Sequence, residues 1–256
     1  GSRGLGDVYK RQVLVKSPYR SQIEERFGKH IFTLAEMSVK VFSDEIVPDM
    51  QEENHLCTAY NDLIASASID FEGEERNLSE LTPFTQSTDR DMRMRANEAK
   101  WGFMDSVSGQ LDEIYDKLVK VRHRMAVKLG YNNFVEMGYN RMLRSDYDAA
   151  MIKRFRGQVK EHIVPFAQLQ RKKQAERLGL TELKFYDEDL FYKDGNPKPK
   201  GSPDWIVENG KKMYRELSKE TAEFFDFMLE NELMDLVTKK GKSPGGYCTF
   251  FVDYKA

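Results

Sequence analysis

Residues 89–130 read DRDMRMRANEAKWGFMDSVSGQLDEIYDKLVKVRHRMAVKLG and form the longest helical pattern in the chain. Apolar residues recur every three or four positions from Ala96 to Leu129, which is the spacing of one helix face. Asp91 lies in the first turn, where a carboxylate complements the helix dipole, and Gly130 can cap the end. At 1.5 Å per residue, this pattern predicts a rod of about 60 Å. So long a helix with one apolar stripe must pack against several others.

The rest of the chain supplies candidate packing partners for this helix. Helical spacing predicts further helices over residues 17–28, 44–65, 146–178, 204–217 and 219–231. Pro165 should kink the 146–178 helix, because it lacks a backbone donor and clashes with the preceding turn. A coiled-coil dimer through the 89–130 stripe is the alternative. Because amphipathic segments flank the stripe in the same chain, we favour an intramolecular bundle.

Two β elements complete the expected fold. Residues 66–79 alternate at Ile69 and Phe71, turn at Gly73 and can return through Leu78, which predicts a small hairpin. Residues 246–254 have the pattern of a single strand. The predicted fold class is therefore mainly α, a multi-helix bundle with one hairpin and one strand.

Composition narrows the class of protein. The 256 residues permit one large domain or two small ones. With 40 Lys+Arg against 42 Asp+Glu, the net charge is −2, so no global basic field attracts nucleic acid or anionic lipid. No window approaches the roughly 18 apolar residues of a membrane span. Cys57 and Cys248 lie far apart, which excludes a disulfide framework and favours a reducing, cytoplasmic location.

The two ends of the chain have unusual sequences. Residues 1–12, GSRGLGDVYKRQ, show no apolar period and resemble a translated adapter, so we set them aside as a non-native leader. The other end, GGYCTFFVDYKA, stops within or just after the expected strand and looks interrupted. We expect the remainder to divide into a helical N-terminal region, 13–145, and a second region, 146–256.

Candidate catalytic patterns are weak when judged from the residues alone. None of the histidines lies in an HExxH pattern; they are His30, His55, His123 and His162. Glu52 and His55 have the Glu-x-x-His spacing of di-iron bundles, but that site needs two copies, so both are expected to be solvated. Residues 241–243 end like a phosphate-binding loop, yet Leu236 stands where its first glycine is required.

A series of sequence blocks nevertheless resembles one family, the oligoendopeptidase F group of zinc metallopeptidases. The blocks occur in order after residue 12: SPYR (17–20), FTLAEMSVKVFS (32–43), QSTDR (86–90), LDEIYDKLVKVR (111–122), GYNRM (138–142), DGNPKPKG (194–201) and KMYRELSKETAEFFDFM (212–228). The closing GGYCTFFVDYK (245–255) is similar to the block that immediately precedes the catalytic segment of that family.

This resemblance implies a two-lobed helical protein whose channel admits short peptides. It also implies one zinc ion, held by a helix with HExxH and a further glutamate, that activates water while the motif glutamate acts as base. The chain ends at Ala256 without an HExxH, so no catalytic residue or metal ligand can be transferred to it. We therefore expect 146–256 to be the leading part of the catalytic domain, zinc to belong to the full-length enzyme, and this chain to be inactive alone. The expected partners are short peptides, with no nucleic acid and no membrane.

The resemblance further suggests a substrate-binding strand edge at Gly246, Tyr247 and Cys248. Peptidases of this type bind substrate as an added strand, so that main-chain hydrogen bonds give affinity without reading sequence. Gly245 and Gly246 would permit close backbone approach. In the alternative reading, the glycines only turn the chain and Cys248 is buried packing.

The sequence is also compatible with a different class of function. The chain could be a stand-alone helical module that binds peptides or acts as a scaffold without catalysis. A stop codon directly after Ala256 in intact genomic DNA would favour that module. An open frame continuing into HExxH would exclude it.

Overall fold

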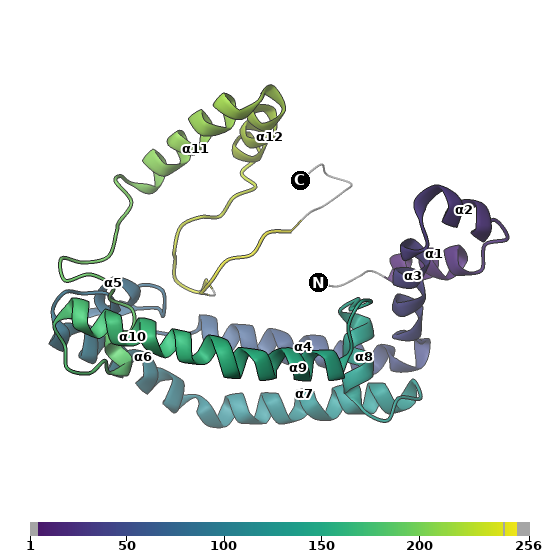
Figure 1. The fold of residues 1–256 in the computed structure, drawn as a ribbon, viewed down its shortest axis with the longest axis horizontal. Helices are drawn as coiled ribbons and strands as arrows, with labels where there is room; N and C mark the ends of the chain where they lie inside the picture. Colours follow the sequence, from purple (N-terminus) through teal and green to yellow (C-terminus); the bar gives the residue numbers. More distant parts are fainter. Residues whose placement is uncertain (1–4, 243, 250–256) are drawn as a thin grey trace. The chain divides into compact units, whose positions relative to one another are not determined.

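The computed structural model describes residues 5–242 and 244–249, and it is mainly helical, as the sequence predicts (Figure 1). It comprises two compact units, each assembled from separate parts of the chain. The first contains residues up to Tyr60 and Ser108–Leu169, and the second contains Asn61–Val107 and residues from Gln170 onward. The expected division of the sequence at 145/146 falls inside the first unit and stays a prediction. Within the described residues, no helix is both long and apolar enough to cross a membrane.

The first unit is built from helices. They are α1 (Leu5–Val15), α2 (Arg20–Phe27), α3 (His30–Lys40), the 3-10 turn η1 (Asp44–Ile46), most of α4 (Val47–Ala65), α7 (Ser108–Lys128), α8 (Phe134–Arg141), α9 (Ala149–Gln158), the π-helical turn η2 (Val159–Ile163) and the start of α10 (Val164–Leu178). Its core consists of the buried side chains of Ile46, Met125, Ala126 and Met137. Met125 belongs to the apolar stripe of residues 89–130, so this part of the stripe forms core as expected.

Two buried carboxylates of α4 receive hydrogen bonds from basic side chains of α7 and α8. Glu53, 4% exposed, accepts from Arg122 Nε at 2.7 Å and from Arg141 Nη2 at 2.9 Å. Asp49, also 4% exposed, accepts from Lys128 Nζ at 2.6 Å. Burial by itself would raise the pKa of both carboxyls, but the hydrogen bonds outweigh it, and each pKa is lowered. These carboxylates therefore stay ionised inside the first unit.

The second unit combines the hairpin with helices from the middle and the end of the chain. Its elements are β1 (Ile69–Phe71), β2 (Glu74–Arg76), α5 (Thr82–Thr85), α6 (Arg90–Ser106), the end of α10, the 3-10 turn η3 (Phe185–Asp187), α11 (Pro203–Leu217) and α12 (Lys219–Glu230). Its core consists of the buried side chains of Ile69, Phe71, Leu81 and Ala96.

The predicted hairpin is confirmed. β1 and β2 pair antiparallel with Ile69 opposite Arg76 and Phe71 opposite Glu74. Between them, Glu72 (φ 55°) and Gly73 (φ 78°) make a two-residue turn in the left-handed region. Ile69 and Phe71 face the core while Asp70 between them is exposed, which is the alternation that the sequence shows.

A buried ion-pair cluster fixes the irregular segment after α10 to α6. Asp187 is fully buried and accepts from Arg93 Nη2 at 2.7 Å, Arg90 Nη2 at 2.7 Å and the backbone N–H of Lys184 at 3.0 Å. Burial alone would raise the pKa of Asp187, but the hydrogen bonds from Arg90, Lys184 and Arg93 lower it. Arg93 is only 2% exposed, so the two charges neutralise one another away from water.

The single rod expected over residues 89–130 is wrong. α6 ends at Ser106, α7 begins at Ser108, and Val107 between them is the residue at which the two helices meet. The local sequence Ser-Val-Ser-Gly explains the break, because serine, β-branched valine and glycine are poor helix formers. Ser106 Oγ also donates to the carbonyl of Phe103 at 2.7 Å and so competes with helical bonding. The predicted stop at Gly130, with φ 84°, is confirmed.

The expected distortion at Pro165 takes the form of a π-helical turn. Residues Val159–Ile163 widen the helix immediately before the proline, between α9 and α10. A wider turn relieves the clash of the proline ring with the preceding carbonyl. The helix itself ends at Leu178, as predicted, and begins at Ala149 after the cap residue Asp148.

Both ends of the chain differ in part from expectation. Residues 5–12, set aside as a leader, lie in α1, where Val8 is buried and Arg11 donates to Ser38 of α3. Their foreign origin stays a prediction. The strand expected at 246–254 is wrong over its described part, since residues 246–249 are irregular, and residues 250–254 lie outside the described part of the chain.

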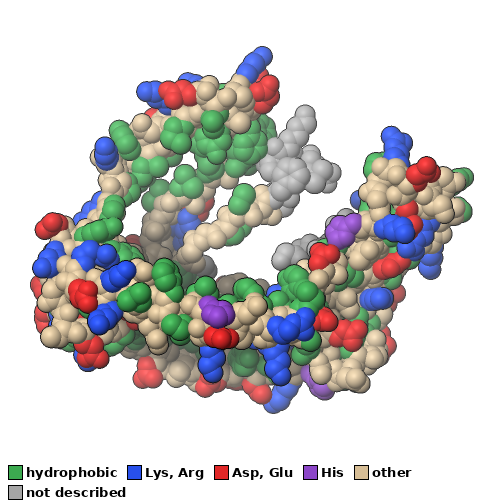
Figure 2. Space-filling view, in the orientation of Figure 1, with side chains coloured by type: hydrophobic (Ala, Val, Ile, Leu, Met, Phe, Trp, Pro, Cys, Tyr) green, Lys and Arg blue, Asp and Glu red, His purple; other side chains and the backbone are tan. Residues whose placement is uncertain are grey.

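The surface carries both signs of charge, as the composition predicts. Figure 2 shows Lys and Arg side chains interspersed with Asp and Glu side chains on the face it displays. Many of these charges pair along one helix, such as Glu113 with Lys117 and Asp116 with Lys120 on α7.

Candidate functional site

The predicted substrate-binding residues lie in an exposed, irregular segment of the second unit. Tyr247 is 94% exposed, and Gly246 and Cys248 are also exposed. Cys248 is a free thiol at the surface, so the alternative reading of buried packing is wrong for this residue. A strand requires a neighbouring backbone, and residues 246–249 form no backbone hydrogen bond with another described residue. All four residues are exposed.

The segment just before these residues is tethered to the hairpin and to itself. The carbonyl of Lys239 accepts from Asn77 Nδ2 at 3.4 Å, and Lys240 pairs with Glu75 of β2 at 3.3 Å. Lys242 Nζ donates to the carbonyl of Asp235 at 2.7 Å. Hydrogen bonds from Lys239 and Lys242 also lower the pKa of the Asp235 carboxyl. The tether fixes where the candidate segment starts and leaves residues 246–249 without a described partner.

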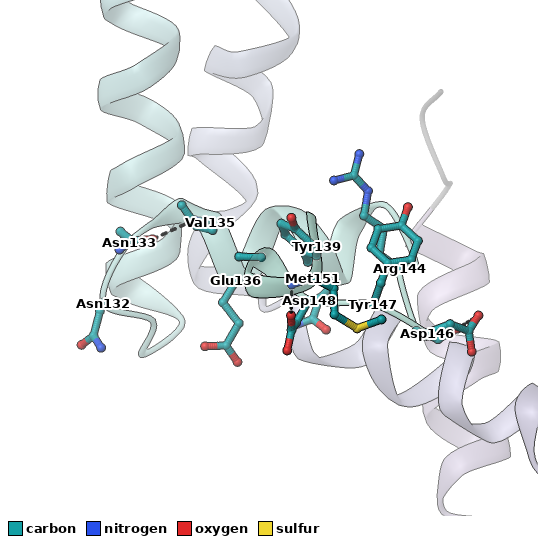
Figure 3. Close-up of a pocket in the computed structure, with 13 residues that line it drawn as sticks. Asn132, Asn133, Val135, Glu136, Tyr139, Arg144, Asp146, Tyr147, Asp148 and Met151 are labelled. Atoms are coloured by element: carbon teal, nitrogen blue, oxygen red, sulfur yellow. Dashed lines mark hydrogen bonds between the residues drawn. The ribbon is translucent and has the colours of Figure 1, made fainter. Parts of the chain in front are cut away.

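A second candidate is an open hollow of about 630 Å³ in the first unit, formed by α8 and the segments on either side of it (Figure 3). Asn133 caps α8 by accepting from the N–H of Val135 at 2.8 Å. At the other end of α8, Leu143 takes the left-handed conformation (φ 53°) that glycine usually supplies. The N–H of Arg144 then closes the turn on the carbonyl of Tyr139 at 3.0 Å. This turn directs Arg144 into the lining of the hollow.

One cation and three carboxylates line the hollow. The guanidinium of Arg144 lies over the rings of Tyr139 and Tyr147, at 5.0 and 5.7 Å, and forms no ion pair with a described residue. Figure 3 shows the carboxylates of Glu136 and Asp148 on the side opposite this guanidinium. Asp146 is the third acid of the lining, and Asp148 also accepts from the N–H of Met151 as the cap of α9. Such a hollow can hold a polar or zwitterionic group, and its lining contains no cysteine, histidine or lysine.

Metal ligands do not converge within the described residues. All four histidines are exposed, and no group of three or more His, Cys, Asp or Glu side chains there could hold a metal ion. His162, on the π-helical turn, has its Nε2 4.0 Å from the carboxylate of Glu161. Glu52, expected to be solvated, is exposed but pairs with Arg124.

Comparison with known proteins gives the family. A family model described as the peptidase M3 N-terminal domain matches residues 6–42. PZ peptidase A, solved with an inhibitor, matches over 97% of this chain with 55% identity and a TM-score of 0.92. The chain belongs to the M3 peptidase family and is of the oligoendopeptidase F type. Two solved structures assigned as oligoendopeptidase F agree with this placement. The first has 53% identity and a TM-score of 0.92 and covers 97% of this chain. The second, from Bacillus anthracis strain Ames, has 52% identity and a TM-score of 0.91 and covers 98% of this chain.

This oligoendopeptidase F-type chain spans less than half the length of those relatives. It covers 44% of PZ peptidase A and of the first oligoendopeptidase F, and 46% of the Bacillus anthracis protein. A search among curated proteins gave no match. The family resemblance drawn from the sequence blocks is therefore confirmed.

The M3 family also bears on the metal. M3 peptidases are in general zinc metallopeptidases. The donors among the described residues do not fit a zinc site, because the histidines lie singly at the surface and no three His, Cys, Asp or Glu side chains there come together. We therefore derive no catalytic step through zinc from these residues.

Sequence reasoning missed the hollow beside α8. One resembling block, GYNRM (138–142), contains Tyr139 of its lining. The signal that could have located it is the short segment after that block, where Arg144, Asp146, Tyr147 and Asp148 crowd between two helices. A cluster of charged and aromatic residues in a short connection is more typical of a binding surface than of a simple turn.

Proposed function

We propose that this chain is part of a zinc-dependent oligoendopeptidase that hydrolyses internal peptide bonds of short peptides. The observation that carries the proposal is the 55% identity and TM-score of 0.92 with PZ peptidase A over 97% of this chain. Because it covers 97% of the chain, this match extends over both compact units.

In this proposal the chain supplies scaffold and substrate contacts, and the chemistry lies elsewhere. Residues 13–145 are the helical N-terminal region, and residues 146–256 are the leading part of the catalytic domain. The sequence has no HExxH, so we infer that the chain alone binds no stoichiometric zinc and cleaves no peptide. The proposed partners are short peptides, and the two isolated cysteines suit a cytoplasmic enzyme.

Gly246, Tyr247 and Cys248 are the proposed substrate contacts. Their main-chain groups have no described hydrogen-bond partner, and the tether at Lys239 and Lys240 holds the start of this segment beside the hairpin. A peptide added as a strand would use those N–H and C=O groups in a ladder. Tyr247, 94% exposed, would then contribute an aromatic surface beside the peptide.

The test compares this chain with and without the rest of an oligoendopeptidase F-type enzyme. The chain is expressed alone and also together with the polypeptide corresponding to the unmatched part of PZ peptidase A. Cleavage of an internally quenched peptide is measured with and without a chelator, and bound zinc is measured by atomic absorption. We expect chelator-sensitive cleavage and one bound zinc only for the co-expressed pair.

Two results would contradict the proposal. Chelator-sensitive cleavage by this chain alone would show that its described residues are sufficient for catalysis. A folded, zinc-loaded pair that cleaves no peptide would contradict the assignment as a peptidase part.

A further inference from the structure

The α11–α12 hairpin buries only one stripe of α11 against α12. Tyr214 of α11 stacks on Phe225 of α12 with ring centroids 4.6 Å apart and planes 7° from parallel. Gly210, one turn earlier, leaves room for the same ring, because a Cβ there would lie 3.2 Å from Phe225. Arg215 closes the pair with a 3.1 Å bond to Asp226. This stripe of α11 is thus packed against α12.

The neighbouring stripe of α11 is apolar and exposed. Ile206, Met213 and Leu217, spaced by seven and four residues, share one helix face and are 45%, 59% and 71% exposed. Neither α11 nor α12 has a buried residue, and each makes extensive contact only with the other among the described elements. Figure 2 shows apolar side chains gathered on this hairpin. We name Ile206, Met213 and Leu217 the α11 apolar stripe.

The size of the stripe limits what can cover it. Three such side chains bury at most about 300 Å² between them, which is well below the about 800 Å² per partner of a free-standing interface. The stripe therefore does not suffice for a dimer of this chain. It fits one part of a larger contact with a partner that is also held at other places.

The lengths of the relatives identify such a partner. PZ peptidase A matches 97% of this chain, a share too large to leave out the α11–α12 hairpin, yet only 44% of its own length is matched. More than half of that enzyme therefore lies outside the shared part and is available to cover a shared apolar face. Resting on the proposed function, we propose that the α11 apolar stripe docks the polypeptide that corresponds to this unmatched part of oligoendopeptidase F-type peptidases.

The test measures binding separately from cleavage. This chain is tagged and co-expressed with the polypeptide corresponding to the unmatched part of PZ peptidase A, and co-purification is quantified. The double variant Met213→Ser with Leu217→Ser is expected to retain at least about tenfold less of the partner, because it removes two apolar side chains from the contact.

The matched control is Lys212→Ser with Glu216→Ser. These exposed residues lie on the same helix at the same spacing, their Nζ and Oε1 are 4.0 Å apart, and their loss together leaves the net charge unchanged. The control is expected to co-purify like the unmodified chain. If the stripe variant loses helicity by circular dichroism, Leu217→Ser alone, at a 71% exposed position, is compared with Lys212→Ser.

Three results would overturn the docking proposal. They are equal retention by the stripe and control variants, absence of co-purification with the unmodified chain, and a concentration-dependent dimer of this chain that the stripe variant abolishes. The proposed function fails separately. A pair that co-purifies but cleaves no peptide refutes the proposed function and leaves the docking proposal standing. A pair that cleaves peptide and co-purifies equally well with the stripe variant refutes the docking proposal and leaves the proposed function standing.

Discussion

Replacing Asp187 with asparagine tests the buried charge cluster that fixes the segment after α10. The substitution keeps the volume of the side chain and removes its charge, so Arg93, 2% exposed, keeps a positive charge without its buried counter-ion. Breaking one partner of a buried ion pair costs about 3–5 kcal/mol. Arg90 is 44% exposed on its side chain and can turn to water, which favours the lower end, about 3 kcal/mol.

The structure supplies a selective probe for this change. The two tryptophans of the chain, Trp101 and Trp205, both belong to the second unit, as does Asp187. Urea unfolding followed by tryptophan fluorescence should therefore report the second unit. With a slope of about 2 kcal/mol per molar urea, a loss of about 3 kcal/mol lowers the midpoint by about 1.5 M.

The matched control is Glu53→Gln, which breaks the corresponding buried cluster of the first unit. It should lower the unfolding midpoint measured by circular dichroism and leave the fluorescence midpoint in place. A fluorescence shift below about 0.5 M for Asp187→Asn would refute the reasoning that the charge is buried and uncompensated.

Three further outcomes are expected. The pKa values of Asp187, Asp49 and Glu53 are lower in the folded chain than their unfolded values near 4, so the stability they add is present above those unfolded values and is lost as the pH falls through the folded ones. At pH values below about 5 the urea midpoint should therefore decrease, and it should decrease less steeply in Asp187→Asn. A midpoint that does not change with pH would contradict this. Gly73→Ala, at φ 78°, should lower the free energy of unfolding by about 1 kcal/mol. Gly102→Ala, in α6, should raise the free energy of unfolding by about 1 kcal/mol at most, and urea unfolding measures both changes. The unmodified chain should bind a hydrophobic dye through exposed apolar faces, and absence of dye fluorescence would argue against such faces.

Much of the fold follows from short-range patterns. The hairpin was predictable because Ile69 and Phe71 alternate before Gly73, and the described register uses that alternation and that turn. The helices at 204–217 and 219–231 were predictable because serines precede them, and Ser202 and Ser218 do cap them. In each case, residues that are neighbours in the sequence determine the secondary structure that forms.

Features that depend on competition or on distant residues were not predictable in the same way. The apolar stripe continues through Val107, so its periodicity hides the local preference of Ser106 and Ser108 against helix, which interrupts the rod. The cluster of Asp187 with Arg90 and Arg93 joins residues more than ninety positions apart, and no sequence spacing encodes that distance.

The candidate site shows the same limit in its strongest form. Alternation at Tyr247, Thr249 and beyond indicates a period of two, but a strand exists only when a second backbone accepts and donates its hydrogen bonds. Within the described residues no such backbone lies beside 246–249, so the pattern yields irregular chain. A segment with strand-like sequence and exposed main-chain groups retains the capacity to pair with an incoming peptide. A peptide adds as a strand to the edge of a sheet that already exists. The proposed role of Gly246, Tyr247 and Cys248 therefore requires this segment to pair with a backbone outside the described residues as well as with the peptide.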